Sequence, residues 1–145
     1  MKDLHATTKV KSLLAPCIVS ATGEIADIDL ANFNAAELII DLGANTGSAP
    51  GDANKLDFKL EHADDDGAGA AGAYSAVAPA DMLGADPASG VFLSTDAAEK
   101  YGKIYQYGYI GGKRFLKMNY TETGIVSVSM AMQLIQGKPL DAPVN

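Results

Sequence analysis

The sequence predicts an all-β domain, an antiparallel β-sandwich of jelly-roll-like or Greek-key type with about seven to nine short strands. Apolar and polar residues alternate along several segments, which places the apolar side chains on one face of each strand. Turn residues separate these segments, and almost no segment has helical periodicity. The 145 residues suffice for one hydrophobic core. We therefore expect one domain over residues 1–145, with an extended N-terminal arm at 1–9 and a C-terminal tail at 139–145.

The first half of the chain predicts four strands. The clearest covers residues 55–62, where Leu56, Phe58 and Leu60 alternate with charged residues, so that one face is buried and the other is wet. A helix would spread these three side chains around its axis. The other predicted strands are residues 10–14, broken at Pro16 and resumed at 17–20, residues 25–30 and residues 37–42.

The second half predicts a β-hairpin near its centre. Two alternating segments, residues 103–110 and 113–120, flank Gly111 and Gly112, and two glycines suit the positive φ angles of a type I′ turn. Residues 125–135 alternate again and predict a last long strand. The shorter elements expected before the hairpin are a strand at 74–78, a helical turn at 79–84, an apolar segment at 91–93 and a helix at 96–101.

The charge balance limits the partners. Eighteen acidic against 11 basic side chains give a net charge of −7, and an acidic surface repels phosphate backbones. We expect no nucleic-acid partner and, without a long apolar segment, no membrane partner. Cys17 is the only cysteine, so a disulfide within the chain is excluded, and we expect this side chain to pack as a small apolar group. No secretory signal is recognisable, which predicts synthesis in the cytoplasm.

No group of residues predicts catalysis, a cofactor or a metal. Gly67, Gly69 and Gly72 have the spacing of a dinucleotide-binding loop, but no helix follows them, so a flexible loop is the better interpretation. Residues 64–66 are three aspartates, yet no later glutamate completes a calcium loop, and a solvated loop tip is favoured. His62 ends a strand without a neighbouring nucleophile, and we expect it at the surface.

Tyr105, Tyr107 and Tyr109 share one face of a predicted strand. Tyrosine combines a large contact area with a polar tip, and it is enriched at protein interfaces. The same three side chains would equally serve as part of the core. Lys113 and Arg114 add a small basic patch, which would meet an acidic neighbour or simply face solvent. These five residues form the predicted interface site.

The segment at 107–115, Tyr-Gly-Tyr-Ile-Gly-Gly-Lys-Arg-Phe, resembles one that recurs in small structural proteins of tailed bacteriophages. Further blocks similar to this family follow in order along most of the chain. They are residues 1–5 with Lys9-Val10, Asp29-Leu30 leading to Phe33, and residues 37–40, 60–65, 80–84 and 142–144. The family comprises head-associated proteins that are made alongside the major capsid protein.

The resemblance implies a capsid decoration or cement protein, a non-enzymatic virion component that binds the outer capsid surface and bridges neighbouring capsomers. It also implies the major capsid protein as partner, a homo-oligomer with a trimer favoured, and a place on the capsid surface after assembly in the host cytoplasm. Two alternatives stay open. One is a head–tail connector or tail structural protein, and the other is a carbohydrate- or cation-binding β module.

Overall fold

The computed structural model describes residues 4–140 of the chain. This part forms ten strands and two short 3₁₀ turns, η1 (Pro79–Asp81) and η2 (Ala98–Lys100). No helix within it is long and apolar enough to cross a membrane. The strands are β1 (Thr8–Val19), β2 (Gly23–Asp29), β3 (Phe33–Asn45), β4 (Lys55–Ala63), β5 (Ser75–Ala76), β6 (Met82–Leu83), β7 (Val91–Ser94), β8 (Lys103–Tyr109), β9 (Phe115–Thr123) and β10 (Val128–Pro139).

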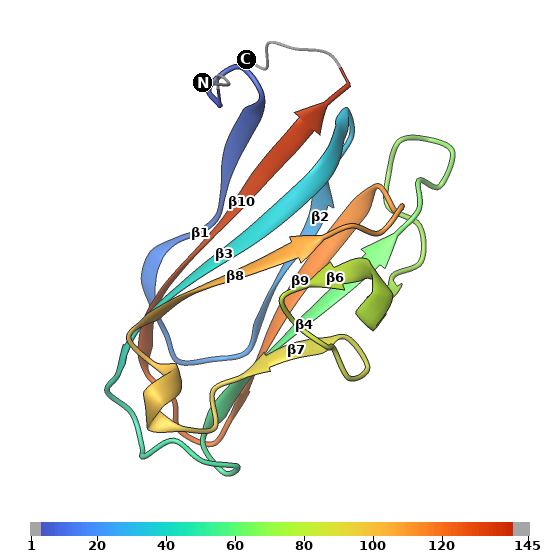
Figure 1. Ribbon diagram of the computed structural model, residues 1–145. Coiled ribbons are helices and arrows are strands. Elements are labelled where there is room, and N and C mark those ends of the chain that lie inside the picture. The colour runs from blue at the N-terminus through green and yellow to red at the C-terminus, as the bar shows by residue number, and fades with distance from the viewer. Residues whose placement is uncertain (1–3, 141–145) are drawn as a thin grey trace.

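The strands form two antiparallel sheets packed as two layers (Figure 1). Sheet A has the order β1-β10-β3-β8-β6, and sheet B has the order β2-β9-β4-β5, with β7 also paired to β4. Eight of these strands have the connectivity of a jelly roll, with β1-β10-β3-β8 in one layer and β2-β9-β4-β7 in the other. Among these eight, the chain changes sheet at every step except between β4 and β7. The predicted antiparallel β-sandwich of jelly-roll-like type is confirmed.

The core lies between the two sheets and is built by the alternating strands. In β4, Leu56, Phe58 and Leu60 are at most 1% exposed, and the charged residues between them lie on the outer face. Each such burial contributes roughly 1.5–3 kcal/mol relative to an exposed side chain. The inward residues of β10 are equally well buried, namely Val128, Met130, Met132 and Leu134. The period-2 pattern therefore identifies the buried face of both strands correctly.

The predicted hairpin at Gly111 and Gly112 is wrong. β8 pairs with β3 and β6 in sheet A, whereas β9 pairs with β2 and β4 in sheet B. Neither glycine has a positive φ angle, so the connection is not a type I′ turn. Both strands direct apolar faces into the core, but from opposite sheets. The connection is a crossover at one end of the sandwich, and alternation within each strand does not distinguish a crossover from a hairpin.

β1 runs without interruption over twelve residues, although the sequence predicts a break at Pro16. β1 is an edge strand of sheet A, and edge strands are where proline is tolerated in sheets. Register shifts between Ser12 and Leu14 and between Leu14 and Cys17 absorb the irregularity. Cys17, which follows the second shift, is exposed and not packed as expected.

The helix expected at residues 96–101 and the helical turn expected at 79–84 both shrink to single 3₁₀ turns, η2 and η1. Directly after η2 the chain joins sheet A, because the Gly102 N–H donates to the carbonyl oxygen of Gly43 (3.1 Å). β8 then begins at the next residue. The pairing with sheet A therefore overrides the local helical preference.

The predicted terminal arms lie partly outside the described residues, because positions 1–3 and 141–145 are not among them. Thr8 and Lys9 already belong to β1, and Pro139 is the last residue of β10. Thr8 is paired with Gly137, so the two described ends of the chain lie at the same end of the sandwich (Figure 1). The division into one domain and two arms stays a prediction.

Candidate interaction surface

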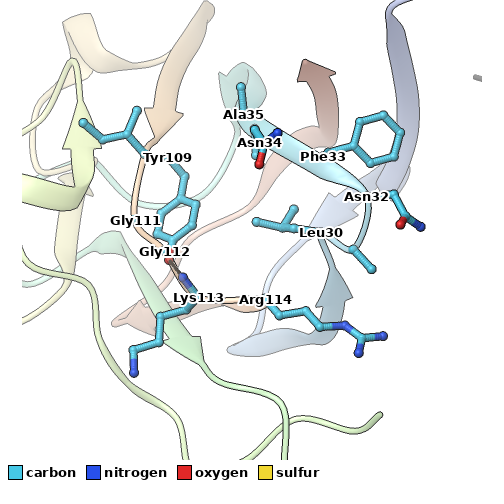
Figure 2. A pocket seen from close by; sticks show the side chains of 13 residues that line it. Leu30, Asn32, Phe33, Asn34, Ala35, Tyr109, Gly111, Gly112, Lys113 and Arg114 are labelled. Carbon is cyan, nitrogen blue, oxygen red and sulfur yellow. Dashed lines mark hydrogen bonds between the residues drawn. The ribbon is translucent and has the colours of Figure 1, made fainter. Parts of the chain in front are cut away.

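Three connections meet at the end of the sandwich that also holds the described chain ends. They are the turn between β2 and β3, the loop that follows β4 and the β8–β9 crossover. We call residues 29–34, 64–72 and 109–114 the end junction. Between the β2–β3 turn and the crossover lies a depression of about 400 Å³, shown in Figure 2. Three of the five predicted interface residues, Tyr109, Lys113 and Arg114, line it, whereas Tyr105 and Tyr107 do not.

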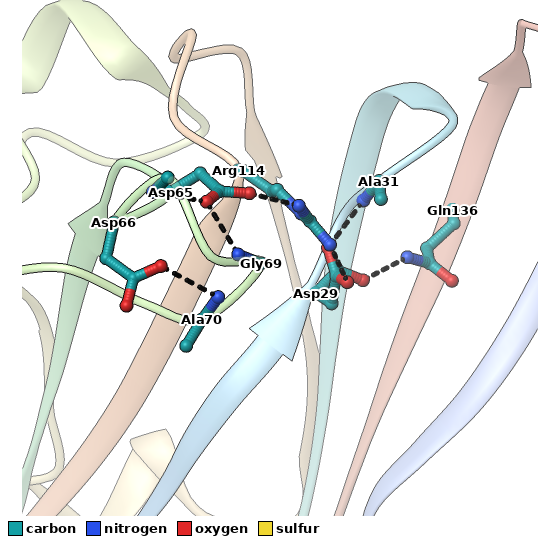
Figure 3. A network of polar contacts seen from close by, with 9 residues as sticks. Asp29, Ala31, Asp65, Asp66, Gly69, Ala70, Arg114 and Gln136 are labelled. Atoms are coloured by element: carbon teal, nitrogen blue, oxygen red, sulfur yellow. Dashed lines mark hydrogen bonds and ion pairs between the residues drawn. The ribbon is translucent and has the colours of Figure 1, made fainter.

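Arg114 ties the three segments together (Figure 3). Its Nε and Nη2 donate to the two carboxylate oxygens of Asp29 at 2.9 and 2.8 Å, and its Nη1 donates to Asp65. The hydrogen bond from Arg114 is the main cause that holds the pKa of the Asp29 carboxyl below its usual range, and the Ala31 N–H adds to the effect. The two carboxylates in turn raise the pKa of Arg114. Bidentate pairs of this kind fix geometry as well as charge.

The aspartate loop is built around its own carboxylates. Asp65 Oδ1 accepts the N–H groups of Gly67 (2.8 Å) and Gly69 (3.0 Å), and these bonds lower the pKa of its carboxyl. Asp66 Oδ1 accepts two further N–H groups of the loop, at 2.8 and 3.1 Å. No helix follows Gly72 (the next element is β5), so the dinucleotide interpretation fails. Side-chain-to-backbone bonds define the path of the loop in the structure.

The three aspartates at 64–66 do not converge on a common point. Asp64 is paired with Lys113, Asp65 with Arg114, and Asp66 with backbone N–H groups. Within residues 4–140, no cluster of three or more metal-ligating side chains is present. The carboxylates of this loop therefore organise the end junction itself.

His62 is buried, at 7% exposure, and its predicted surface position is wrong. Its Nδ1 lies 3.0 Å from Tyr109 Oη, and Oη also accepts the N–H of Lys113 at 3.2 Å. Because this N–H occupies a lone pair of the oxygen, the hydroxyl proton is free to point at Nδ1 of a neutral imidazole. Burial lowers the pKa of His62 and raises that of Tyr109 to about 12. The signal was present in the sequence, since His62 has the same parity as Leu60 on the inward face of β4.

The tyrosine stripe divides between core and surface. Tyr107 and Tyr109 are 8% and 4% exposed and belong to the core of the single chain, which is the alternative that the sequence left open. Their interface role stays a prediction. Their side of β8 faces sheet B, and Tyr107 packs edge-on against Phe92 with ring centroids 4.8 Å apart. Tyr105 is only partly buried and donates its hydroxyl to the carbonyl oxygen of Lys100 (2.8 Å). For Tyr105 the interface role stays a prediction.

The predicted basic patch is neutralised within the chain. Lys113 pairs with Asp64 and Arg114 with Asp29 and Asp65, and each of the two cationic side chains is about one third exposed. Their partners lie 49 to 85 positions away in the chain, so no local sequence pattern indicates them. The interface role of Lys113 and Arg114 stays a prediction, and any partner would compete with these internal ion pairs.

No protein-family model matches the chain, and no curated protein matches it. Among solved structures, it is similar to one of infectious bursal disease virus Gx strain, with 14% identity, a TM-score of 0.35 and coverage of 90% of this chain and 32% of that one. It is also similar to the VP2 subviral particle of infectious bursal disease virus, with 11% identity, a TM-score of 0.27 and coverage of 97% and 44%. The chain thus spans less than half the length of these proteins. TM-scores this low establish neither a common fold nor a common function.

Proposed function

We propose that this protein is a non-enzymatic structural component of a virion, a decoration or cement protein. It binds the outer surface of the capsid, contacts the major capsid protein and bridges neighbouring capsomers as a homo-oligomer, with a trimer favoured. The proposal is supported by the resemblance to head-associated phage proteins and by the way the structure gathers the residues that carry this resemblance.

The observation that carries the proposal is the convergence of these sequence blocks. Residues 29–33, 60–65, 80–84 and 107–115 belong to different parts of the chain, yet contacts connect them in and beside the end junction. The Ile110 N–H donates to the Asp81 carbonyl oxygen (2.9 Å), Met82 pairs with Tyr109, and Arg114 joins the remaining two blocks. The residues of these four blocks therefore lie next to one another in the fold.

The architecture agrees with this class. Jelly rolls occur in viral capsid proteins, and also in lectins and cupins. A fold by itself does not specify a function, so the sequence blocks are what narrow the choice to a virion. The polar side chains of the end junction bond mainly to one another, which suits a structural role.

A decoration role also agrees with the physics of repeated weak contacts. Many identical copies on one shell convert a modest contact into a large total stabilisation, because each additional contact acts at a high effective concentration. Lattice or cyclic symmetry then repeats the same contact across the particle.

The test compares virus particles assembled with and without this chain. Heads and tails are separated, the chain is quantified in each fraction by mass spectrometry, and the temperature of genome release from the heads is recorded. We expect the chain in the head fraction, at a copy number set by the shell lattice, and earlier genome release from heads without it. A copy number of about a dozen or fewer per particle, as in a single ring of subunits, or recovery with tails, would favour a connector or tail protein. Absence from all particles would refute a virion role.

A further inference from the structure

The two outer faces of the sandwich differ in their charge chemistry. The outer face of sheet B neutralises itself, since Lys55 pairs with Asp57 (3.5 Å) and Glu61 binds both Lys59 and Lys117 at 2.8 Å. These cations hold the pKa of Glu61 at about 2. A protein partner would have to break these ion pairs, so this face is better suited to exposure to solvent than to a protein contact.

The outer face of sheet A is half apolar. The register places Val10 of β1 opposite Ile135 of β10, and Ile104 of β8 opposite Asp41 of β3, all on the side away from the core. Val10 and Ile104 are 61% and 65% exposed. Towards the end junction, a shallow depression of about 570 Å³ is lined by Ile135, Leu83 and other small or apolar residues. Its polar lining residues are Thr8, Glu37, Gln106 and Lys138. Contiguous apolar surface of this kind, here Val10 beside Ile135, is found at contact surfaces.

The same face carries two carboxylates that form no ion pair with the described residues. Glu37 and Asp41 flank Ile39 on β3, the middle strand of sheet A, and neither carboxylate forms an ion pair within the described chain. No lysine or arginine occupies an outward position in the registered pairs of β3 with β10 and β8. Two copies facing each other would bring carboxylates together with no cation to separate them, which is unfavourable. A partner that presents lysine or arginine beside apolar side chains is complementary to this face.

The sheet edges are poorly suited to adding a strand. β1 carries Pro16 and two register shifts, and β2 has a shift between Ile25 and Ile28 with Asp27 at a φ angle of 54°. The opposite edges are formed by β5 and β6, with two residues each, and the four-residue β7. Prolines, bulges and short edge strands all hinder edge-to-edge pairing. Docking through a face is therefore favoured over docking through an edge.

We infer that the outer face of sheet A is the surface through which this protein docks, and that its partner is a capsid-shell surface with basic residues beside apolar ones. The inference rests on the proposed function and adds the docking face and the chemistry of the partner. Ion pairs form between the shell and Glu37 and Asp41, while Val10, Ile104 and Ile135 lose their contact with water.

The test measures binding of the purified chain to particles assembled without it, by co-sedimentation. The Glu37→Lys/Asp41→Lys variant reverses both charges of the face. The control, Asp52→Lys/Glu99→Lys, makes the same change in net charge at two exposed carboxylates elsewhere. We expect the face variant to bind about tenfold more weakly or worse, a change of about 1.4 kcal/mol or more, and the control to bind like the unmodified chain. Circular dichroism and thermal melting verify that both variants are folded.

A second pair of variants tests the apolar part. Ile104→Asn lies on the face and Ile125→Asn lies outside it, and both isoleucines are 65% exposed. We expect only Ile104→Asn to weaken binding. If the unmodified chain does not bind particles, the proposed function fails. If it binds and both face variants bind as well as their controls, the docking face is wrong. If Ile104→Asn instead dissociates an oligomer of the free chain, a second copy covers this face and the inference is overturned.

Discussion

His62 lies on the inward face of β4, near the C-terminal end of the strand and beneath the β8–β9 crossover. Its ring meets the Tyr109 ring edge-on with centroids 6.0 Å apart. Both side chains are in the core, and each satisfies a polar atom of the other. The charged groups around the imidazole are Asp81, Asp64 and Lys113, which act in opposite directions, so burial decides the outcome. The folded protein therefore favours the neutral imidazole.

This pair predicts a specific pH dependence. The pKa of His62 is lowered from 6.5 in the folded state, so the unfolded chain takes up the proton first as the pH falls. The contribution of His62 to the unfolding free energy is fully present above about pH 6.5. It declines as the pH falls toward the folded pKa and then levels off. The slope from this group is at most about 1.4 kcal/mol per pH unit. Asp29 and Glu61 also lose their contributions to the unfolding free energy as the pH falls, but only at lower pH, since their reference pKa values are 3.8 and 4.5.

Urea unfolding between about pH 7.5 and 5 measures this slope. We expect His62→Gln to flatten it and the exposed-site control His5→Gln to retain it. A His62→Gln variant whose unfolding free energy follows the pH as steeply as the unmodified protein would contradict the assignment.

The β8–β9 crossover is the element on which the end junction depends. It joins the two sheets, supplies Lys113 and Arg114, and places the Lys113 N–H on Tyr109. Its two glycines are in different surroundings. A Cβ on Gly111 would lie 2.5 Å from Tyr109 Oη, whereas a Cβ on Gly112 would have no atom within 4 Å.

The two glycines therefore predict opposite outcomes. Gly111→Ala forces the Tyr109 hydroxyl away from its partners and should cost about 1–3 kcal/mol of unfolding free energy. Gly112→Ala has space and no positive φ angle, so it should be neutral or stabilise by up to about 1 kcal/mol. Chemical denaturation of both variants decides between the crossover and a type I′ hairpin, in which both substitutions would be destabilising.

Arg114 makes the β2–β3 turn, the aspartate loop and the crossover dependent on one another. We expect Arg114→Lys and Asp29→Asn each to lower the melting temperature, because lysine lacks the two-pronged geometry that matches Asp29. The double variant should melt close to the single ones, since both changes remove the same bond pair. A matched cycle at the pair Lys55–Asp57 should show little effect, because this pair has one contact of 3.5 Å and no two-pronged geometry. Fully additive losses at Arg114 and Asp29 would contradict the coupling.

At the scale of the whole molecule, the sequence reveals what is local and misses what is distant. Alternation in β4 and β10 identifies strands and buried faces because consecutive side chains point to opposite sides. It also marks His62 as inward, by the parity that it shares with Leu60. Which strands pair is set by contacts across the chain, so β8 and β9 look like a hairpin although they lie in different sheets. The bond of Arg114 to Asp29 spans 85 positions and has no sequence signal.

The assembled molecule has one outer face that neutralises its own charges and one that is half apolar with unpaired carboxylates. The proposed docking turns sheet A toward the shell and sheet B toward solvent. The described chain ends and the end junction lie at one end, to the side of this contact. The same orientation is expected for every copy.

A reconstruction of the virus particle, at a resolution that separates strands, tests this account most directly. It predicts jelly-roll density repeated over the outer surface of the capsid with the shell lattice, with β3 and its residues Glu37 and Asp41 turned toward basic residues of the shell. Density for this chain only at the tail or at a single vertex, or sheet A turned toward solvent in every copy, would contradict it.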